Sequence, residues 1–258
     1  MKENTLRAKL QRGEATYGML TPIYDPTIVE VIGRLGFDFY MMDGEHGAGG
    51  PLQLEHLVRA CETVGMTPLV RVPTSEPKAV LQYLDTGVMG VMLPGVREAG
   101  DVQRLVDAVK YPPVGQRGVA GVRANDYLLG PMAQADYVRF ANEQTLILPQ
   151  IETMDAVHNI EALVRVAGID GFIVGPRDLS MAMGFYDGPA HPEVRAVIDH
   201  VFDVVLGAGL PIGTTAPTGE EAADLVARGA RIILGSVAWL LKAGASQFFQ
   251  AARQAEPS

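Results

Sequence analysis

TLILPQIETMDAVHNIEALVRVAGIDGFIVGPRDLS, at residues 145–180, is the stretch that predicts the fold. Its two apolar runs, 145–151 and 171–175, have the length and the β-branched content of buried strands. The residues between them, 154–167, carry apolar side chains at helical spacing. The stretch therefore predicts a strand, a helix and a second strand, with the two strands parallel.

Polar side chains follow both strands of this unit. Gln150 and Glu152 lie at the end of the first strand, and Asp178 comes just past the second. Because the two strands point the same way, these side chains should meet at one rim of the sheet. Two crowded carboxylates repel each other unless a cation lies between them, and hard oxygen ligands with room for water suit Mg²⁺ or Mn²⁺. The unit thus predicts a divalent metal site.

The same alternation of short apolar runs and helical patterns continues along the chain. The runs that predict strands are 15–20, 37–42, 67–72, 90–94, 145–151, 171–175, 210–214 and 231–235. Further helical patterns occupy 26–35, 52–64, 77–85, 99–109, 192–207, 220–228 and 236–253. Repeats of this kind with right-handed crossovers predict an α/β fold, a (β/α)8 TIM barrel, in which the connection 111–142 is irregular in its first half. A doubly wound open sheet is the alternative.

Composition narrows the class of partner. The pattern runs without a linker through all 258 residues, which predicts a single domain over 1–258. A net charge of −9 argues against a nucleic acid or an anionic membrane surface as partner, and favours small molecules. Cys61 is the single cysteine, and the first residues, MKENTLRAKL, lack the apolar core of a signal peptide. No apolar run approaches the roughly 20 residues that cross a bilayer as a helix, so we expect a cytoplasmic protein.

Charged residues gather where strands end, which is where active sites of TIM barrels lie. Taken singly, Asp43 could be a turn former, Arg71 a surface ion-pair partner and Asp178 a helix cap. Charged ends on four strands of one barrel face are better explained by a site. The segments are Asp43-Gly44-Glu45-His46 after the second strand, Arg71 at the end of the third, Gln150 and Glu152 after the fifth, and Pro176-Arg177-Asp178 after the sixth.

These residues in this order resemble the HpcH/HpaI family, the metal-dependent class II pyruvate aldolases. The likeness covers nearly the whole chain. It is carried by FDFYMMDGEH (37–46), LVRV (69–72), LQYLDTG (81–87), YPPVGQRGV (111–119), LPQIET (148–153), GFIVGPRDLS (171–180) and His191-Pro192-Glu193.

The resemblance implies a barrel of the phosphoenolpyruvate/pyruvate type that uses Mg²⁺, Mn²⁺ or Co²⁺ to add a pyruvate-type enolate reversibly to an aldehyde. It implies a homo-oligomer as well, a hexamer built as a trimer of dimers whose C-terminal helices are exchanged between subunits. The resemblance implies that Glu152 and Asp178 are the metal ligands, with Asp43 and Glu45 ordering metal-bound water. It implies that Arg71 contacts the substrate and stabilises the enolate oxygen, and that Gln150 and the backbone around Arg177 contact the oxoacid. It also implies that His46 is the acid/base residue, oriented by Asp85.

Physical chemistry agrees with these roles. A 2-oxoacid can chelate a metal through a carboxylate oxygen and its keto oxygen, and the metal then acidifies the neighbouring methyl group. Arg71, always protonated, adds a second positive group beside the developing oxyanion. The other aldolase strategy needs a Schiff-base lysine. No lysine lies at a predicted carboxyl end of a strand; the lysines are Lys2, Lys9, Lys78, Lys110 and Lys242.

Two other functions stay open. The same metal-bound enolate would form if oxaloacetate lost CO₂ in this site, which would make the protein a decarboxylase or a related diacid lyase. A catalytically idle barrel that binds a metabolite is the alternative from another class, and the complete set of Arg71, Glu152 and Asp178 argues against it.

The predicted C-terminal helix, 236–253, carries more large apolar side chains than one buried helix face needs. This excess predicts contact with a partner subunit. The side chains are Trp239, Leu240, Leu241, Phe248 and Phe249.

Overall fold

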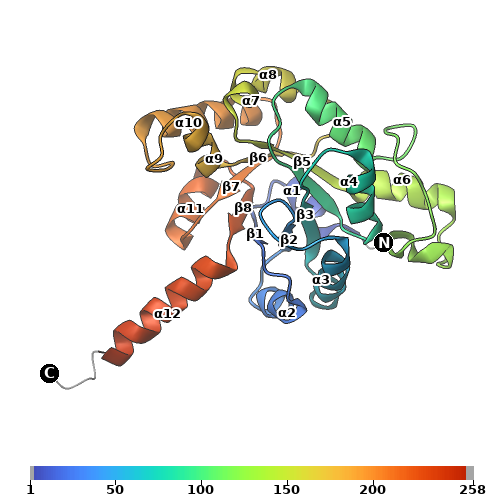
Figure 1. Cartoon of the computed structure of the whole chain (residues 1–258), viewed down its shortest axis with the longest axis horizontal. Coiled ribbons are helices and arrows are strands. Elements are labelled where there is room, and N and C mark those ends of the chain that lie inside the picture. Colours follow the sequence, from blue (N-terminus) through green and yellow to red (C-terminus); the bar gives the residue numbers. More distant parts are fainter. Residues whose placement is uncertain (1–2, 254–258) are drawn as a thin grey trace.

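Eight parallel strands form a closed barrel in chain order, with β8 paired back to β1 (Figure 1). The computed structural model describes residues 3–253, so Lys2 lies outside the described residues. The predicted TIM barrel is confirmed, every predicted strand is present within two residues of its expected ends, and the open sheet is wrong. The strands are β1 Thr16–Thr21, β2 Phe39–Asp43, β3 Thr67–Arg71, β4 Gly90–Leu93, β5 Leu146–Ile151, β6 Phe172–Val174, β7 Ile212–Thr215 and β8 Ile232–Gly235.

Helices connect the strands on the outside of the barrel. Those that match predicted helices are α2 Pro26–Arg34, α3 Pro51–Val64, α4 Pro77–Asp85, α5 Ala99–Val109, α10 Pro192–Gly207, α11 Gly219–Ala227 and α12 Val237–Arg253. The structure adds α1 Thr5–Gln11, the 3-10 helix η1 Arg123–Leu128, α6 Gln134–Gln144 and α9 Pro176–Ala182. The irregular first half of the connection 111–142 is as predicted, since it contains η1 and no α-helix before α6.

The single helix predicted over 154–167 is wrong. Two short helices, α7 Met154–His158 and α8 Ile160–Leu163, replace it, and they are separated at Asn159, which has φ −99° and ψ 7°. The Asn159 side chain donates a hydrogen bond to the backbone oxygen of Arg97 (3.0 Å). A polar side chain that bonds to a neighbouring loop competes with helix continuation, and this accounts for the break.

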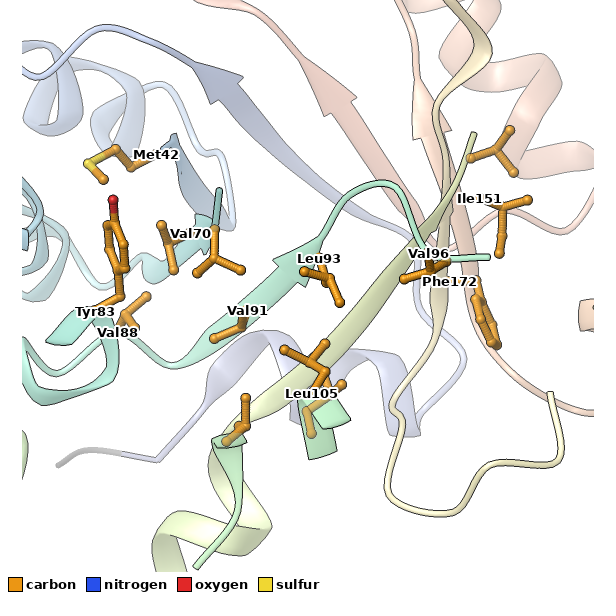
Figure 2. Close-up of a cluster of buried hydrophobic side chains, with 14 of the residues drawn as sticks. Met42, Val70, Tyr83, Val88, Val91, Leu93, Val96, Leu105, Ile151 and Phe172 are labelled. Atoms are coloured by element: carbon orange, nitrogen blue, oxygen red, sulfur yellow. The ribbon is translucent and has the colours of Figure 1, made fainter. Parts of the chain in front are cut away.

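Side chains alternate along each strand between the inside of the barrel and the layer under the helices. Figure 2 shows part of the outer layer, where Tyr83 of α4 points toward Met42 and Leu105 of α5 lies near Val91 and Leu93. The inner layer is a separate apolar cluster that fills the barrel. On three strands the inner series ends in a polar residue: Phe39, Met41 and Asp43 on β2, Leu69 and Arg71 on β3, and Leu146, Leu148 and Gln150 on β5.

The amino-terminal end of the barrel is closed by α1. Leu6 and Leu10, one helical turn apart, are buried in the inner cluster. Asn4 caps the helix by accepting from the Arg7 N–H (3.0 Å), and its side-chain amide donates to the backbone oxygens of Met89 (3.0 Å) and Gln144 (2.7 Å). With this end sealed, the polar inner residues face the open carboxyl-terminal end.

The last helix, α12, leaves the barrel and projects from it (Figure 1). Of its described residues only Val237 is buried. Leu241 is 63% exposed and Phe248 is 68% exposed. No helix within residues 3–253 combines the length and the apolar character needed to span a bilayer.

Candidate active site

A cavity of about 380 Å³ opens at the carboxyl-terminal end of the barrel. The sequence predicted six of the polar side chains that line it, and they come from the ends of β2, β3, β5 and β6. These six are Asp43, His46, Arg71, Gln150, Arg177 and Asp178. The structure thus brings together side chains that lie up to 135 positions apart in the chain, counted from Asp43 to Asp178.

Asp43 and Arg71 form an ion pair across two neighbouring strands. They are direct partners in the register of β2 and β3. The Arg71 Nε donates to Asp43 Oδ1 (2.9 Å) and its Nη2 donates to Oδ2 (2.6 Å), while Nη1 lies 3.2 Å from Glu45 Oε2. The Arg71 side chain is 7% exposed and that of Asp43 is 6% exposed, so the reading of Arg71 as a surface ion-pair partner is wrong.

Both members of this pair are held in their charged forms. Burial alone would raise the pKa of Asp43, but the hydrogen bonds and charge of Arg71, with two backbone N–H groups, bring it below its ordinary value. Burial alone would lower the pKa of Arg71, but Asp43, with smaller contributions from Glu45 and Glu152, raises it. The cavity therefore contains a fixed guanidinium with N–H donors that Asp43 does not use.

Asp43 also shapes the loop that carries Glu45 and His46. Its Oδ1 accepts from the N–H groups of Glu45 (3.1 Å) and His46 (3.2 Å), so the turn-forming role and the contact with Arg71 coexist. Tyr24 donates from its hydroxyl to the backbone oxygen of Asp43 (2.8 Å). A Cβ at Gly47 would lie 1.5 Å from the Tyr24 hydroxyl oxygen, so the loop can wrap this ring only with glycine there. Sequence reasoning missed Tyr24, because no motif marks the loop after β1.

Glu152 is buried beside the cavity, and two neighbours hold its carboxylate. The Gln150 side-chain amide donates to Oε2 (2.5 Å) and the Gly95 N–H donates to Oε1 (2.7 Å). Burial raises the pKa of Glu152 to about 7, and the charges of Asp178 and Glu45 act in the same direction. A Cβ at Gly175 would lie 2.6 Å from Oε2, so the glycine after β6 makes room for this carboxylate.

Asp178 and Arg177 lie in the first turn of α9, and both are exposed to the cavity. Gly175 is the N-cap residue of α9, and no side chain makes a capping hydrogen bond there. The reading of Asp178 as a helix cap is therefore wrong. Its carboxylate is left facing the cavity, close enough to Glu152 to raise the pKa of that residue.

The donors around Glu152 fit a divalent cation. Glu152 and Asp178 supply two carboxylates that repel each other, and the Oε1 atom of Gln150 is buried without a hydrogen-bond partner within residues 3–253. A cation or its water would satisfy such atoms. Within the same residues, no group of three or more His, Cys, Asp or Glu side chains is arranged to hold a metal. Two carboxylates with positions left for water and substrate suit Mg²⁺ better than a metal that demands a full protein cage.

The expected pairing of His46 with Asp85 is wrong within one chain. Asp85 is the last residue of α4, which runs from the carboxyl end of β3 back toward the amino end of β4, so it lies at the opposite end of the barrel from His46. There it accepts a hydrogen bond from Arg117 (3.0 Å). The acid beside His46 is Glu45, whose Oε2 lies 3.4 Å from the imidazole Nε2.

Two of the described lysine side chains make polar contacts away from the cavity. Lys9 contacts Asp38 (2.5 Å), and the buried Lys110 donates to the backbone oxygens of Asn142 (2.7 Å) and Thr145 (2.6 Å). None of the described lysines is among the residues that line the cavity.

Trp239 of α12 lines the cavity without having been predicted there, beside Thr215 of β7 and Ser236, which follows β8. Trp239 was expected at a subunit contact, but it lies in the first turn of α12 and reaches the cavity. Its place just after β8 was the available signal, because the residues that follow a barrel strand face the active end.

Known proteins share this chain's sequence and fold. The model of the HpcH/HpaI aldolase/citrate lyase family matches residues 16–238. A 5-keto-4-deoxy-D-glucarate aldolase of Shigella dysenteriae serotype 1 is 34% identical over 231 residues, which cover 89% of each protein. An HpcH/HpaI aldolase structure from Desulfitobacterium hafniense DCB-2 has a TM-score of 0.90 at 31% identity, covering 98% of both chains. The structure of citrate synthase SbnG has a TM-score of 0.86 at 29% identity, covering 96% of this chain and 97% of that one.

Proposed function

The chain belongs to the HpcH/HpaI aldolase/citrate lyase family, and on that premise we propose that it adds a pyruvate-type enolate reversibly to an aldehyde, giving a 4-hydroxy-2-oxoacid. Membership makes the protein a lyase of the class II aldolase type. The observation that supports the reaction most is that one cavity is lined by the fixed guanidinium of Arg71 and by Asp178, whose carboxylate repels that of Glu152 buried beside the cavity.

Arg71 would hold the oxoacid and the negative charge that develops on its keto oxygen. Asp43 occupies Nε and one N–H of Nη2, which fixes the plane of the guanidinium and leaves other donors for the substrate. Because the pair is already buried and ionised, no reorganisation is needed when charge appears on the substrate, and this is how electrostatic preorganisation lowers a barrier.

Glu152 and Asp178 would hold a divalent cation, Mg²⁺, Mn²⁺ or Co²⁺, with Gln150 beside it. When bound, such a cation would withdraw charge from the oxoacid and acidify its methyl group. Glu45 and Asp43 would order water around the site. The family's resemblance also assigns the oxoacid contact to Gln150 and to the backbone around Arg177, both of which border the cavity.

His46 would take the methyl proton and return one to the new hydroxyl group. Its imidazole is largely exposed at the cavity, where it can meet a bound substrate. Imidazole is the side chain best suited to accept and release a proton near neutral pH. Glu45, rather than Asp85 of the same chain, is placed to orient it.

An isotope-exchange experiment tests the proposal. The protein with Mg²⁺ and pyruvate in D₂O should exchange the methyl protons, and addition of a small hydroxylated aldehyde should give a product whose mass shows the new carbon–carbon bond. Borohydride should not trap the pyruvate on the protein, because none of the lysines within residues 3–253 borders the cavity. Undiminished exchange in a metal-free variant with Glu152→Gln and Asp178→Asn, or trapping by borohydride, would contradict the mechanism.

A decarboxylase or diacid lyase is the second candidate. The likeness to citrate synthase SbnG favours keeping it, because that protein's name places different carbon–carbon chemistry on the same fold. Oxaloacetate as substrate separates the two functions. Only a decarboxylase would release CO₂ from it quickly and show no preference for any aldehyde.

We further propose that the protein works as a homo-oligomer, a hexamer in the form that the family resemblance implies. The exposed apolar side chains of α12 support this.

The net charge of −9 supports a small 2-oxoacid and aldehyde as partners, without nucleic acid or membrane. The single cysteine, Cys61, is buried and free, which suits the reducing cytoplasm.

A further inference from the structure

The loop 94–98 joins β4 to α5 at the carboxyl-terminal end of the barrel, and none of its residues lines the active-site cavity. It nevertheless contacts one of the two proposed metal ligands, because the Gly95 N–H donates to Oε1 of Glu152 (2.7 Å). Any effect of the loop on the site must therefore pass through its backbone.

Two side chains from the segment after β5 hold the backbone of this loop on one side. The Thr153 hydroxyl donates to the backbone oxygen of Val96 (3.0 Å), and the Asn159 side-chain amide donates to that of Arg97 (3.0 Å). With the bond from Gly95 to Glu152, three consecutive residues of the loop are tied to the segment 152–159. These are bonds between parts of the chain that are more than fifty positions apart.

The other side of the loop is fixed by α5 and by the apolar core. Asp101 accepts through Oδ2 from the N–H groups of residues 97 (2.8 Å) and 98 (3.1 Å). The Val96 side chain is buried in the outer apolar cluster (Figure 2). Gly95 has a φ of +63°, a conformation that glycine adopts without strain. The direction of the Gly95 N–H is therefore set by the whole loop.

The orientation of the Glu152 carboxylate depends on this N–H. Gln150 donates to Oε2 and Gly95 donates to Oε1, so each oxygen has one protein donor and keeps capacity to bind a cation. A carboxylate already held in one plane loses less freedom when it binds a metal. Partners that orient a metal ligand in this way typically contribute about 10- to 100-fold to metal affinity.

We propose that residues 95–98 form a positioning loop for the metal site. Thr153 and Asn159 fix the loop, the loop fixes the Gly95 N–H, and that N–H fixes the Glu152 carboxylate. This rests on the metal-binding part of the proposed function. The interruption between α7 and α8 then has a role in the site, because Asn159, the residue at the break, is one of the two that tie the loop.

The test measures the affinity of the metal-free protein for Mn²⁺ by electron paramagnetic resonance, which reports binding without turnover. Asn159→Ala and Thr153→Val should each raise the Kd for Mn²⁺ by about tenfold, as expected for lost partners of a metal ligand. Thr153→Ser keeps the hydroxyl, so its Kd should return to within about twofold of that of the unaltered protein.

Thr218→Val is the matched control for Thr153→Val. Both threonines cap a helix: Thr153 accepts from the Ala156 N–H (3.1 Å) and Thr218 accepts from the Glu221 N–H (3.2 Å). Only Thr153 also bonds to the positioning loop. Thr218→Val should therefore lower the Tm by losing its cap and leave the Kd for Mn²⁺ unchanged.

Gly95→Ala tests the N–H itself, with Gly209→Ala as its control. Both glycines have positive φ, +63° and +74°, and a Cβ at either would meet nothing within 4 Å. Alanine is strained at such φ values, so both variants should have a lower Tm. Only Gly95→Ala should also weaken Mn²⁺ binding, because relief of its strain turns the N–H away from Glu152.

Failure of the metal site and failure of the positioning loop are distinguishable. If the unaltered protein does not bind Mn²⁺, or Glu152→Gln binds it equally well, the proposed metal site is wrong. If Glu152→Gln weakens binding but Asn159→Ala and Gly95→Ala leave the Kd unchanged, the role of the loop is overturned. An effect of Thr153→Val alone would assign Thr153 to the end of β5 and would overturn that role as well.

Discussion

Arg71 owes its place in the cavity to its position along β3, two residues after Leu69 on the inner face. That inner position was predictable from the sequence, because alternation along a strand places every second side chain on one face. Its partner was not predictable. Asp43 meets Arg71 because the register of β2 and β3 makes them direct neighbours, and register depends on packing across the whole barrel.

Replacing Arg71 by lysine should show how much of its contribution to catalysis comes from its positive charge and how much from the fork geometry of its guanidinium. Lysine keeps a positive charge but cannot make the two hydrogen bonds that Arg71 makes with Asp43. We expect kcat for aldol cleavage to fall by roughly 10² or more, as for other lost oxyanion donors. Steady-state kinetics checks this, with Arg195→Lys as the control on an exposed arginine; a near-normal kcat in Arg71→Lys would assign Arg71 to structure alone.

Glu152 should make the metal-free protein less stable as the pH rises. Its pKa is raised from an ordinary 4.5 to about 7, so the folded state favours the protonated form. The resulting stabilisation is complete below about 4.5 and is lost as the pH rises through about 7. Tm measured in chelator should therefore fall from pH 5 to pH 8, and Mg²⁺ should raise Tm more at pH 8 than at pH 5.

The matching control for this pH dependence is Glu152→Gln, which keeps the shape and cannot ionise. Other groups also titrate in this range, so the informative quantity is the difference in Tm between the two proteins at each pH. A difference that stays constant from pH 5 to pH 8 would show that Glu152 does not titrate as described.

At the scale of elements, the strands were the easiest part to predict and the short helices the hardest. Runs such as 145–151 are apolar on both faces because the barrel interior lies on one side and the helices on the other. The end helix α1 was missed because only Leu6 and Leu10 mark it. The break at Asn159 depends on a hydrogen bond to Arg97, which no local pattern reveals.

The loop after β2, which carries His46, packs around the ring of Tyr24 and is hydrogen-bonded to its hydroxyl. Tyr24→Phe removes the hydrogen bond to the Asp43 backbone and keeps the ring around which the loop wraps. A single hydrogen bond contributes about 0.5–1.5 kcal/mol, so we expect kcat to fall by up to about tenfold, with a smaller change in the KM for pyruvate. Kinetics of aldol cleavage checks this.

Tyr17→Phe is the control, because the Tyr17 side chain is 40% exposed and its hydroxyl makes no hydrogen bond within residues 3–253. It should leave kcat and KM unchanged. Equal kinetics for Tyr24→Phe and Tyr17→Phe would remove Tyr24 from any role in positioning the loop. A fall in Tm without a change in kcat would limit it to stability.

For the whole molecule, the barrel and its active end were predictable because both follow from the repeat of strand and helix. The location of Asp85 was not. The sequence shows that Asp85 lies in a helical pattern, but which end of the barrel it occupies depends on where that helix stops. The proposed assembly depends likewise on α12, whose direction away from the barrel no local pattern predicts (Figure 1).

Glutamate substitutions on α12 should reveal whether that helix holds subunits together. Leu241→Glu with Phe248→Glu places charge on side chains that are 63% and 68% exposed in the single chain. If a partner covers them, the light-scattering mass at micromolar concentration should fall from an oligomer to a monomer. Leu35→Glu, at a residue 66% exposed on the barrel surface, should leave the mass unchanged. A monomeric mass for the unaltered protein would contradict the assembly.

In the proposed oligomer, the geometry of α12 would make the reaction rate depend on protein concentration. Its first turn carries Trp239 into the wall of the cavity, and its later turns reach well beyond the barrel. A partner subunit that fixes the far end of the helix would therefore also fix the position of the Trp239 indole in the cavity wall. Activity per molecule should decline when the enzyme is diluted until the far end is released. When the diluted protein is concentrated again, the activity per molecule should return after a lag. The length of this lag should depend on the rate at which subunits associate, and not on the rate of the chemical step.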